Sequence, residues 1–215
     1  MKSIKELSGI KGKRILLRVD FNVPMNNGKV EDDSRIKKAL PTINYLRKLG
    51  AKIVIISHIG RDPQDSLETV SKVLKHSIPV TFVHSVLGKE VDDAINRMKN
   101  GDVIMLENLR SASGEKKNDA SFARGLSKHG DIYVNEAFPV SHRADASIVG
   151  VPKFLPSYAG LQMELEVKEL SRALTPEHPF LVISEEPFRA VDHDPQHHHV
   201  SQEQDIISGK ADIII

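Results

Sequence analysis

The 215-residue sequence has no cysteine and no tryptophan, and aromatic residues make up only 5% of it. The absence of cysteine excludes disulfides and thiolate metal sites, and it suits a reducing compartment. The formal net charge is only +1, so the chain has no overall field that would attract nucleic acid or an acidic membrane. No apolar run is long enough to span a bilayer, and the charged start, MKSIKELSGIKGKR, does not resemble a signal peptide. We therefore expect a soluble, cytoplasmic protein with neither nucleic-acid nor membrane partners.

Short apolar runs alternate with helical patterns along most of the chain. Strands are predicted at 14–21, 52–58, 80–84, 102–108, 131–138 and 180–184, and helices at 34–48, 66–76, 91–100, 119–129 and 159–174. The first five strands are unbroken and rich in β-branched residues, which is typical of strands covered on both faces. This alternation predicts an α/β fold with a Rossmann-like, doubly wound parallel sheet and helices on both faces.

Local signals mark where some of these helices begin and end. Asp65 with Glu68 resembles a capping box at the start of the second helix. Gly50, Gly101 and Gly130 lie where helices are expected to stop.

Polar residues follow several predicted strands, at the edge where ligands bind in open parallel sheets. They are Asp20 and Asn22 after the first strand, Arg35 at the first helix, His58 and Arg61 after the second strand, Arg110 after the fourth, and His142 and Arg143 after the fifth. Arginine forks match phosphate and carboxylate groups, so four converging arginines indicate a small anionic ligand carrying such groups.

Each of these residues also has a plainer interpretation. A single arginine is often an exposed residue in a weak ion pair, and Asp20 could cap a turn instead of accepting a hydrogen bond from a ligand hydroxyl. The histidines could be ordinary hydrogen-bonded loop residues, and we interpret His76, His84 and His129, which lie at the ends of elements, as structural or solvent-facing. Nucleic acid is disfavoured because aromatic residues are not interleaved with the basic ones. The anionic-ligand hypothesis therefore depends on the whole group of residues.

Six stretches, taken in order, resemble the amino-terminal lobe of the phosphoglycerate kinase family. They are RVDFNVP, DDSRIKKALPTINYL, KIVIISHIGR, VIMLENLR, DIYVNEAF with SHRADAS, and VGVPKFLPSYAGLQMELEVKEL. The resemblance covers residues 1 to about 183. It implies a glycolytic enzyme family that exchanges a phosphoryl group between Mg-ATP or Mg-ADP and 3-phosphoglycerate, and that is typically monomeric.

The resemblance also implies a role for each candidate residue. Asp20 and Asn22 would hold the hydroxyl and carboxylate region of 3-phosphoglycerate, and Arg35, as the catalytic residue, would stabilise charge on the transferring phosphoryl group. The basic patch around the substrate phosphate would consist of His58, Arg61, Arg110 and Arg143, with His142 in the same motif. Pro139 and Asp145 depart from the family pattern, and we expect Asp145 to neutralise part of the patch and lower substrate affinity.

The family pattern breaks down near the carboxyl end. By resemblance, residues 1–157 form the 3-phosphoglycerate domain, 158–175 the interdomain helix, and 176–215 a remnant of the nucleotide lobe, with 184–207 irregular. SEEPF stands where the family has a glycine-rich turn bearing lysines, so Glu185 and Glu186 bring negative charge to a phosphate position. We assign no nucleotide-binding residue and expect no phosphoryl transfer from ATP by this chain alone. A frame shift, local decay or rearrangement would explain the foreign segment.

The histidines of the tail raise the alternative of a metal site. His193 and His197 are four residues apart and would share a face of a helix, but Pro195 lies between them and the segment has no helical periodicity. With His198 and His199 they are expected to lie in a disordered polar tail that has no functional metal.

Two functions remain open at this point. The first is a fragment of a phosphoglycerate kinase that binds 3-phosphoglycerate. The alternative is a non-catalytic protein that binds a phosphorylated metabolite or interacts with a partner chain. In either case the apolar runs HPFLVI and ADIII lack the rest of their sheet, and we expect them to pair with each other, dock on the first domain or cause association.

Overall fold

The computed structural model describes residues 2–173, 181–182 and 213–214. The chain divides into two compact units, Met1–Val167 and Lys168–Ile215, and each is considered by itself.

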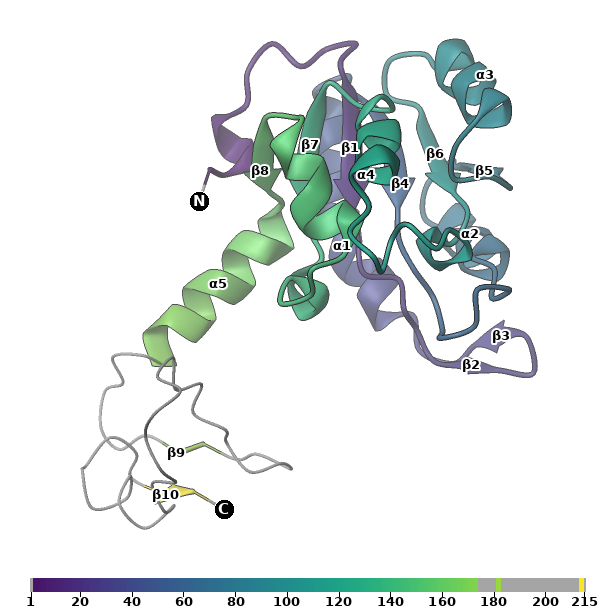
Figure 1. Ribbon diagram of the computed structural model, residues 1–215. Helices are drawn as coiled ribbons and strands as arrows, with labels where there is room; N and C mark the ends of the chain where they lie inside the picture. Colours follow the sequence, from purple (N-terminus) through teal and green to yellow (C-terminus); the bar gives the residue numbers. More distant parts are fainter. Residues whose placement is uncertain (1, 174–180, 183–212, 215) are drawn as a thin grey trace. The chain divides into compact units, whose positions relative to one another are not determined.

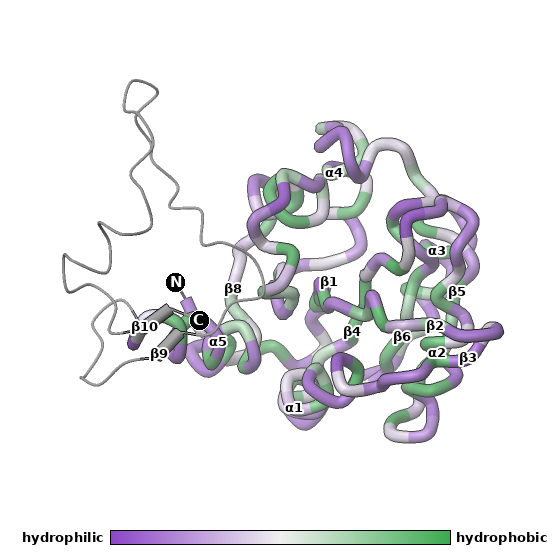
Figure 2. Tube along the Cα trace, turned by 90° about the horizontal axis from the view of Figure 1, so that it is seen from below, coloured by the Kyte–Doolittle hydropathy of each residue, from purple (hydrophilic) through white to green (hydrophobic). Residues whose placement is uncertain are grey.

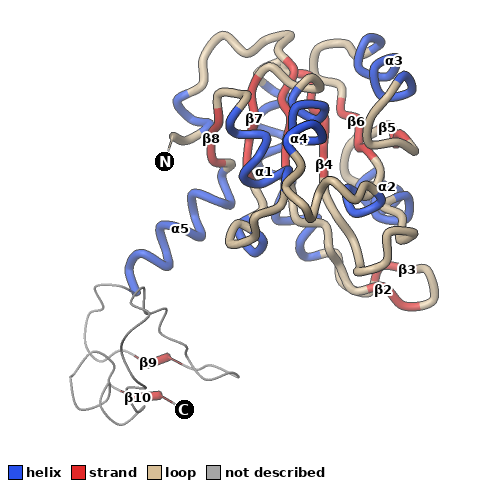
Figure 3. The backbone as a smooth tube through the Cα atoms, viewed as in Figure 1, coloured by secondary structure: helices blue, strands red, loops and turns tan. Residues whose placement is uncertain are grey.

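The first unit is built on a sheet of six parallel strands (Figures 1 and 3). They are β1 (Arg14–Arg18), β4 (Lys52–Ile56), β5 (Thr81–Val83), β6 (Val103–Leu106), β7 (Ile132–Asn135) and β8 (Ser157–Ala159). Their order across the sheet is β5-β6-β4-β1-β7-β8. The chain first builds outward from β1 on one side and then returns to its other side, which is the doubly wound arrangement predicted from the sequence.

The register of the sheet sorts its apolar residues into two faces. One row across four strands contains Tyr133, Leu16, Val54 and Ile104, and the next row contains Val134, Leu17, Ile55 and Met105. Because successive side chains of a strand point to opposite faces, the two rows contribute to separate core clusters. The unbroken apolar character of these strands therefore follows from burial on both faces.

Helices cover both faces, as predicted. The helices α1 (Ser34–Lys48) and α2 (Glu68–Lys75) pack on the face that contains Leu17, and α3 (Lys89–Arg97) and α4 (Ala120–Ser127) pack on the face that contains Leu16. Hydrophobic and hydrophilic residues alternate along α3 in Figure 2, because only one side of this surface helix contacts the sheet.

The structure differs from the sequence prediction at the start of two helices. The capping box at Asp65 is wrong: α2 begins after Leu67 without a side-chain cap, and the Asp65 carboxylate accepts the N–H of Asp62 instead (3.2 Å). The fifth helix, α5 (Leu161–Ala173), begins two residues later than predicted, because Ser157–Ala159 form the edge strand β8.

The first turn of α5 is attached to the sheet by two polar side chains. Thr42 Oγ1 accepts the N–H of Leu161 (2.9 Å), and the buried Glu136 carboxylate accepts the N–H groups of Gln162 (3.1 Å) and Met163 (3.3 Å). These are the N–H groups that a helix start leaves without partners inside the helix. Glu136 follows β7 directly, so this helix start is fixed beside the carboxyl edge of the sheet.

The short hairpin of β2 (Met25–Asn26) and β3 (Lys29–Val30) was not predicted. Its signal is Asn27–Gly28, where both residues have positive φ (49° and 74°) as a tight two-residue turn requires. The other short elements are 3-10 turns at Ile4–Glu6, Leu109–Ser111, Phe138–Val140 and Val151–Lys153, and a π-helical turn at Ala146–Gly150.

In the second unit, β9 (Leu181–Val182) pairs in parallel with β10 (Ile213–Ile214). This confirms the first of the three outcomes expected for HPFLVI and ADIII, that they pair with each other. The predictions for SEEPF and for the four tail histidines lie outside the described residues. None of the helices in the described part of the chain has the length and apolar character needed to cross a membrane.

Candidate functional site

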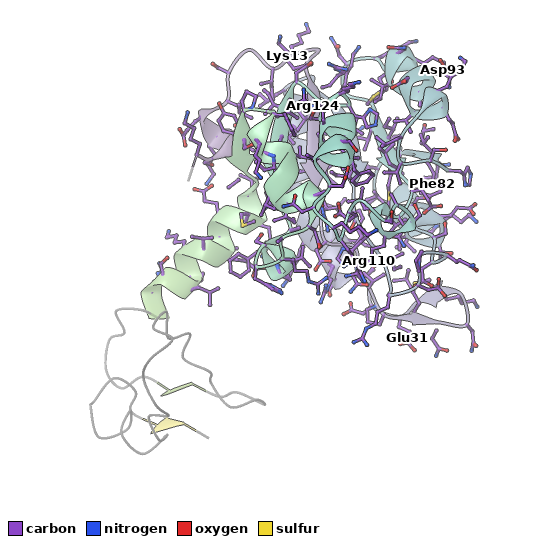
Figure 4. The ribbon with its side chains drawn as sticks, in the orientation of Figure 1. Lys13, Glu31, Phe82, Asp93, Arg110 and Arg124 are labelled. Carbon is purple, nitrogen blue, oxygen red and sulfur yellow. The ribbon has the colours of Figure 1, made fainter. Side chains whose placement is uncertain are left out.

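The carboxyl ends of the parallel strands bring most of the predicted site residues to one edge of the sheet. Arg110 follows β6 at this edge, and Lys13, which precedes β1, lies at the opposite edge (Figure 4). Asp20 and His58 follow β1 and β4 and are 7% and 2% exposed. Burying such polar groups is costly unless they have partners, so the surrounding loops carry specific hydrogen bonds.

Two buried side chains hold these loops together. Ser57 Oγ donates to the carbonyl of Val19 (2.8 Å) and accepts the N–H of Phe21 (2.9 Å), which ties the end of β4 to the end of β1. Asn108, after β6, accepts the N–H of Ile59 (3.2 Å) and donates to its carbonyl (3.0 Å). The loop that carries His58 is thus fixed from both sides.

Gly60 lies at the centre of this loop in the left-handed conformation (φ +62°). Its N–H donates to Oδ1 of Asn22 (2.9 Å), and its carbonyl accepts a hydrogen bond from the guanidinium of Arg110. A Cβ atom on Gly60 would approach Oδ2 of Asp65 to 1.7 Å. Position 60 therefore needs glycine both for its φ angle and for lack of space.

We expect Gly60→Ala to lower the free energy of unfolding by about 2–3 kcal/mol, from a left-handed alanine and the displaced Asp65 hydrogen bond. Gly28→Ala is the matched control, because Gly28 also has positive φ (+74°) but open space around its Cβ position. The control should lose only about 1–2 kcal/mol. Urea unfolding of both variants measures the difference, and equal losses would mean that the Asp65 contact does not restrict position 60.

His58 is surrounded by positive charge. Burial lowers its pKa most, and the charges of Arg18, Arg110, Arg143 and Arg35 lower it further, to about 2. The imidazole is therefore neutral at physiological pH, and the arginines are close enough to influence it from four different segments of the chain. Burial and the neighbouring Arg143 also lower the pKa of the Arg110 guanidinium, while Asp145 opposes that shift. The structure thus brings together most of the predicted basic patch and places the expected neutralising carboxylate beside it.

Asp20 and Asn22 lie next to this basic group. The Asp20 carboxylate forms an ion pair with Arg35 and accepts the N–H of Asn22 (3.2 Å). The Asp20 side chain is 6% exposed, whereas that of Arg35 is 43% exposed. A cavity of about 200 Å³ lies beside the pair, lined by Asp20, Arg35, Lys38, Ala39, Glu136, Pro139, Gln162 and Glu166. The Arg35 side chain is thus partly open to solvent, while the Asp20 carboxylate is buried.

The two remaining candidates are less closely connected to the group. Arg61 and His142 are both exposed, and in the described part of the chain neither side chain forms a hydrogen bond or ion pair with another residue. Arg61 directly follows Gly60, so its backbone belongs to the fixed loop. Their assignment to the site remains a prediction.

A buried network behind His58 was missed by the sequence analysis. Arg18 is fully buried, and it contacts His58 Nδ1 (3.0 Å) and Ser147 Oγ (2.9 Å). Ser147 in turn donates from Oγ to the buried Glu115 carboxylate (2.5 Å). The signal was the arginine that ends the apolar run RILLR, because an arginine inside a strand buried on both faces needs a partner. Glu115 has no such local signal. In the described residues, no group of three or more His, Asp or Glu side chains is placed to hold a metal.

Comparison with known proteins identifies the family of this chain. The family model for phosphoglycerate kinase matches residues 4–184. The chain is 47% identical over 182 residues to the phosphoglycerate kinase of Bartonella henselae and 48% identical over 181 residues to that of Dictyoglomus turgidum. Each match covers 81% of this chain and 46% of the relative, so the chain spans about half the length of these curated relatives.

Solved structures give the same result. The crystal structure of phosphoglycerate kinase from Pyrococcus horikoshii OT3 matches with a TM-score of 0.84 at 29% identity, over 100% of this chain and 54% of that one. The structure of phosphoglycerate kinase from Coxiella burnetii matches with a TM-score of 0.73 at 34% identity, over 84% of this chain and 47% of that one. The family model alone covers well over half of the sequence, and the chain belongs to the phosphoglycerate kinase family.

Proposed function

We propose that the first unit of this chain binds 3-phosphoglycerate as the acceptor half of a phosphoglycerate kinase. The observation that carries the proposal is the convergence of Arg35, Arg110 and Arg143 on the buried, neutral His58. Guanidinium groups bind phosphate and carboxylate oxygens in pairs of parallel hydrogen bonds. A small ligand with one group of each kind therefore suits this edge of the sheet.

The charges of the site favour a phosphate at the end formed by Arg110 and Arg143, away from Asp20. Asp20 pairs directly with Arg35. The carboxylates that oppose the charge of Arg110 are instead Asp145 and the buried Glu115. We assign the substrate phosphate to Arg110, Arg143 and the exposed Arg61. His58 Nε2 is buried and has no hydrogen-bond partner within the described residues, so it supplies a further donor for an anionic oxygen.

The carboxylate and hydroxyl of the substrate are assigned to the other end of the site. Asp20 and Asn22 are held in place by their own hydrogen bonds, and Asp20 is suited to accept one from the substrate hydroxyl. Arg35 is half-exposed beside the cavity and would turn from Asp20 toward the substrate carboxylate. In phosphoryl transfer this carboxylate accepts the phosphoryl group, and catalysis consists mainly of positioning and charge stabilisation. Arg35 would provide that stabilisation.

Mg-ATP or Mg-ADP is the other substrate of the family, and the described residues give no ground for assigning it a site in this chain. The proposal is therefore limited to the 3-phosphoglycerate half of the reaction. We expect no turnover in a coupled assay of the 215-residue protein alone, as the acidic SEEPF segment also suggests.

Titration calorimetry with 3-phosphoglycerate, glycerate and ATP tests the proposal. We expect 3-phosphoglycerate to bind, and glycerate to bind at least about tenfold more weakly, because charge-assisted hydrogen bonds to the phosphate are each worth about 1.5–3 kcal/mol. ATP should show no binding. Equal affinity for glycerate and 3-phosphoglycerate, or no binding of either, would place the ligand site elsewhere.

A further inference from the structure

Arg18 is buried, and burying a guanidinium costs free energy unless its N–H groups have hydrogen-bond partners. It is the last residue of β1 and is 0% exposed. Its side chain extends on the face that carries Leu16, because the two residues are two positions apart in the strand. Nε donates to Ser147 Oγ (2.9 Å), one terminal nitrogen donates to the carbonyl of Val19, and the other lies 3.0 Å from His58 Nδ1.

The contact with Arg18 determines which nitrogen of His58 carries the proton. A guanidinium has only donors and stays protonated in proteins, so Nδ1 of His58 must be the acceptor. In a neutral imidazole the proton then belongs to Nε2. That nitrogen lies on the side of the ring away from Arg18, is buried, and has no hydrogen-bond partner within the described residues. The result is a neutral N–H group without a partner, next to the proposed phosphate site.

Arg18 is itself held by a second pair of residues. Glu115 is 1% exposed and accepts the N–H (3.0 Å) and the hydroxyl (2.5 Å) of Ser147. The same hydroxyl accepts the Nε–H of Arg18. Ser147 therefore links the two buried charges, and Glu115 balances the charge of Arg18 without competing with His58 for the guanidinium.

We propose that Arg18 is a positioning residue, which fixes His58 as the Nε2–H tautomer so that a neutral donor faces the ligand, and that Ser147 and Glu115 hold Arg18 in place. The nature of the ligand rests on the proposed function above, but the tautomer of His58 does not.

Every cation near His58 acts in the same direction on its titration. Arg18 on β1, Arg35 on α1, Arg110 after β6 and Arg143 after β7 all disfavour a second proton on the ring. Their carboxylate neighbours, Glu115, Asp145 and Asp20, contact or oppose the arginines and do not hydrogen-bond to the ring. His58 should therefore donate equally well across the range of about pH 5 to 8 in which an ordinary histidine titrates.

Nuclear magnetic resonance of the ligand-free protein tests the tautomer directly. With ¹⁵N-labelled histidine, long-range ¹H–¹⁵N spectra separate a protonated from an unprotonated ring nitrogen. We expect His58 to show an unprotonated Nδ1 and a protonated Nε2, without change between about pH 5 and 8. A proton on Nδ1, or titration of His58 within this range, would overturn the proposal.

Two variants test the role of Arg18. Arg18→Met with Glu115→Gln removes the donor and the buried countercharge together, and His58 should then populate both tautomers and titrate closer to its ordinary range. Ser147→Ala, a milder change, should shift the His58 resonances in the same direction. Both variants should weaken 3-phosphoglycerate binding by about two- to tenfold, the effect of one misplaced hydrogen bond. A His58 spectrum identical to that of the wild type in both variants would show that Arg18 does not set the tautomer.

The same measurements separate the two proposals. If wild-type His58 shows the expected tautomer but 3-phosphoglycerate does not bind, the proposed function fails and the role of Arg18 stands. If 3-phosphoglycerate binds but His58 carries its proton on Nδ1, the role of Arg18 fails and the proposed function stands.

Discussion

Arg18→Met alone is expected to lower the free energy of unfolding by about 3–5 kcal/mol, the loss typical when one partner of a buried charge pair is removed. The variant keeps an unbranched, though shorter, side chain and leaves Glu115, which is 1% exposed, without a balancing charge. It also leaves His58 Nδ1 and the carbonyl of Val19 without the donor that they have in the wild type. Urea unfolding at constant pH measures the loss.

The double variant Arg18→Met with Glu115→Gln should recover most of that loss, because the uncompensated carboxylate is removed with its partner. The amide of the Glu115→Gln variant can still accept the Ser147 N–H with its oxygen and donate to the Ser147 hydroxyl with its nitrogen. Arg97→Met is a control of the same chemistry on an exposed residue at the end of α3, and it should change stability by less than about 0.5 kcal/mol. Equal losses in the single and double variants would mean that Glu115 does not balance the charge of Arg18.

The pH dependence of the single variant has a definite sign. Burial raises the pKa of Glu115 above its ordinary value of 4.5, and the charge of Arg18 opposes that shift. Without Arg18 the folded-state pKa rises further, so the folded protein binds the proton more tightly than the unfolded chain. The contribution of Glu115 to stability is then largest at low pH, and it falls as the pH rises from the ordinary value toward the raised pKa. The stability lost by Arg18→Met should therefore be smaller at acidic pH than at neutral pH.

The sheet and its covering helices were predictable from the sequence because burial on both faces leaves a strong local signal. Runs such as KIVIISH have no polar alternation, and the helices between them have one apolar side. The edge strand Ser157–Ala159 has no such signal, because it is only three residues long and directly follows a proline. Its pairing depends on contacts with β7, which no local pattern in these three residues indicates.

The site was predictable to the extent that its residues directly follow strands. His58, Arg110 and Arg143 come together because the carboxyl ends of parallel strands meet at one edge. Arg18, Ser147 and Glu115 were missed because they come from three distant segments and lie behind the ligand-facing residues. Of these three residues, only Arg18 has a local sequence signal, because it lies inside an apolar run. The exposed Arg61 and His142 show where prediction from sequence position stops. A position after a strand places the backbone of a residue, but it does not fix where a flexible side chain lies.

The second large effect is expected at Arg143, which should contribute strongly to the affinity for 3-phosphoglycerate. Its charge acts on both His58 and Arg110, and no hydrogen bond of its side chain within the described residues supports the fold. Arg143→Ala should therefore weaken binding by about 10- to 150-fold, which corresponds to one charge-assisted contact of about 1.5–3 kcal/mol, with unchanged thermal stability. Arg110→Ala should weaken binding similarly but also destabilise the loop, because it releases the Gly60 carbonyl. Arg97→Ala removes the same charge from an exposed position on α3 and should leave the affinity unchanged. A similar loss of affinity in Arg97→Ala would mean that the effect of Arg143→Ala comes from the overall charge of the protein.

A substitution of Asp145 should change the affinity for 3-phosphoglycerate in the opposite direction to Arg143→Ala. Its carboxylate offsets part of the positive charge at Arg110, so a bound phosphate is repelled by Asp145 while it is attracted by the arginines. Asp145→Asn keeps the shape of the side chain and removes that repulsion, and 3-phosphoglycerate should bind a few-fold more tightly, with glycerate affected less. The gain should shrink as salt is raised, because screening weakens the interaction between partly exposed charges. Weaker binding in this variant would mean that Asp145 orients the arginines and does not oppose the ligand. A gain together with the loss in Arg143→Ala would locate the substrate phosphate between these side chains.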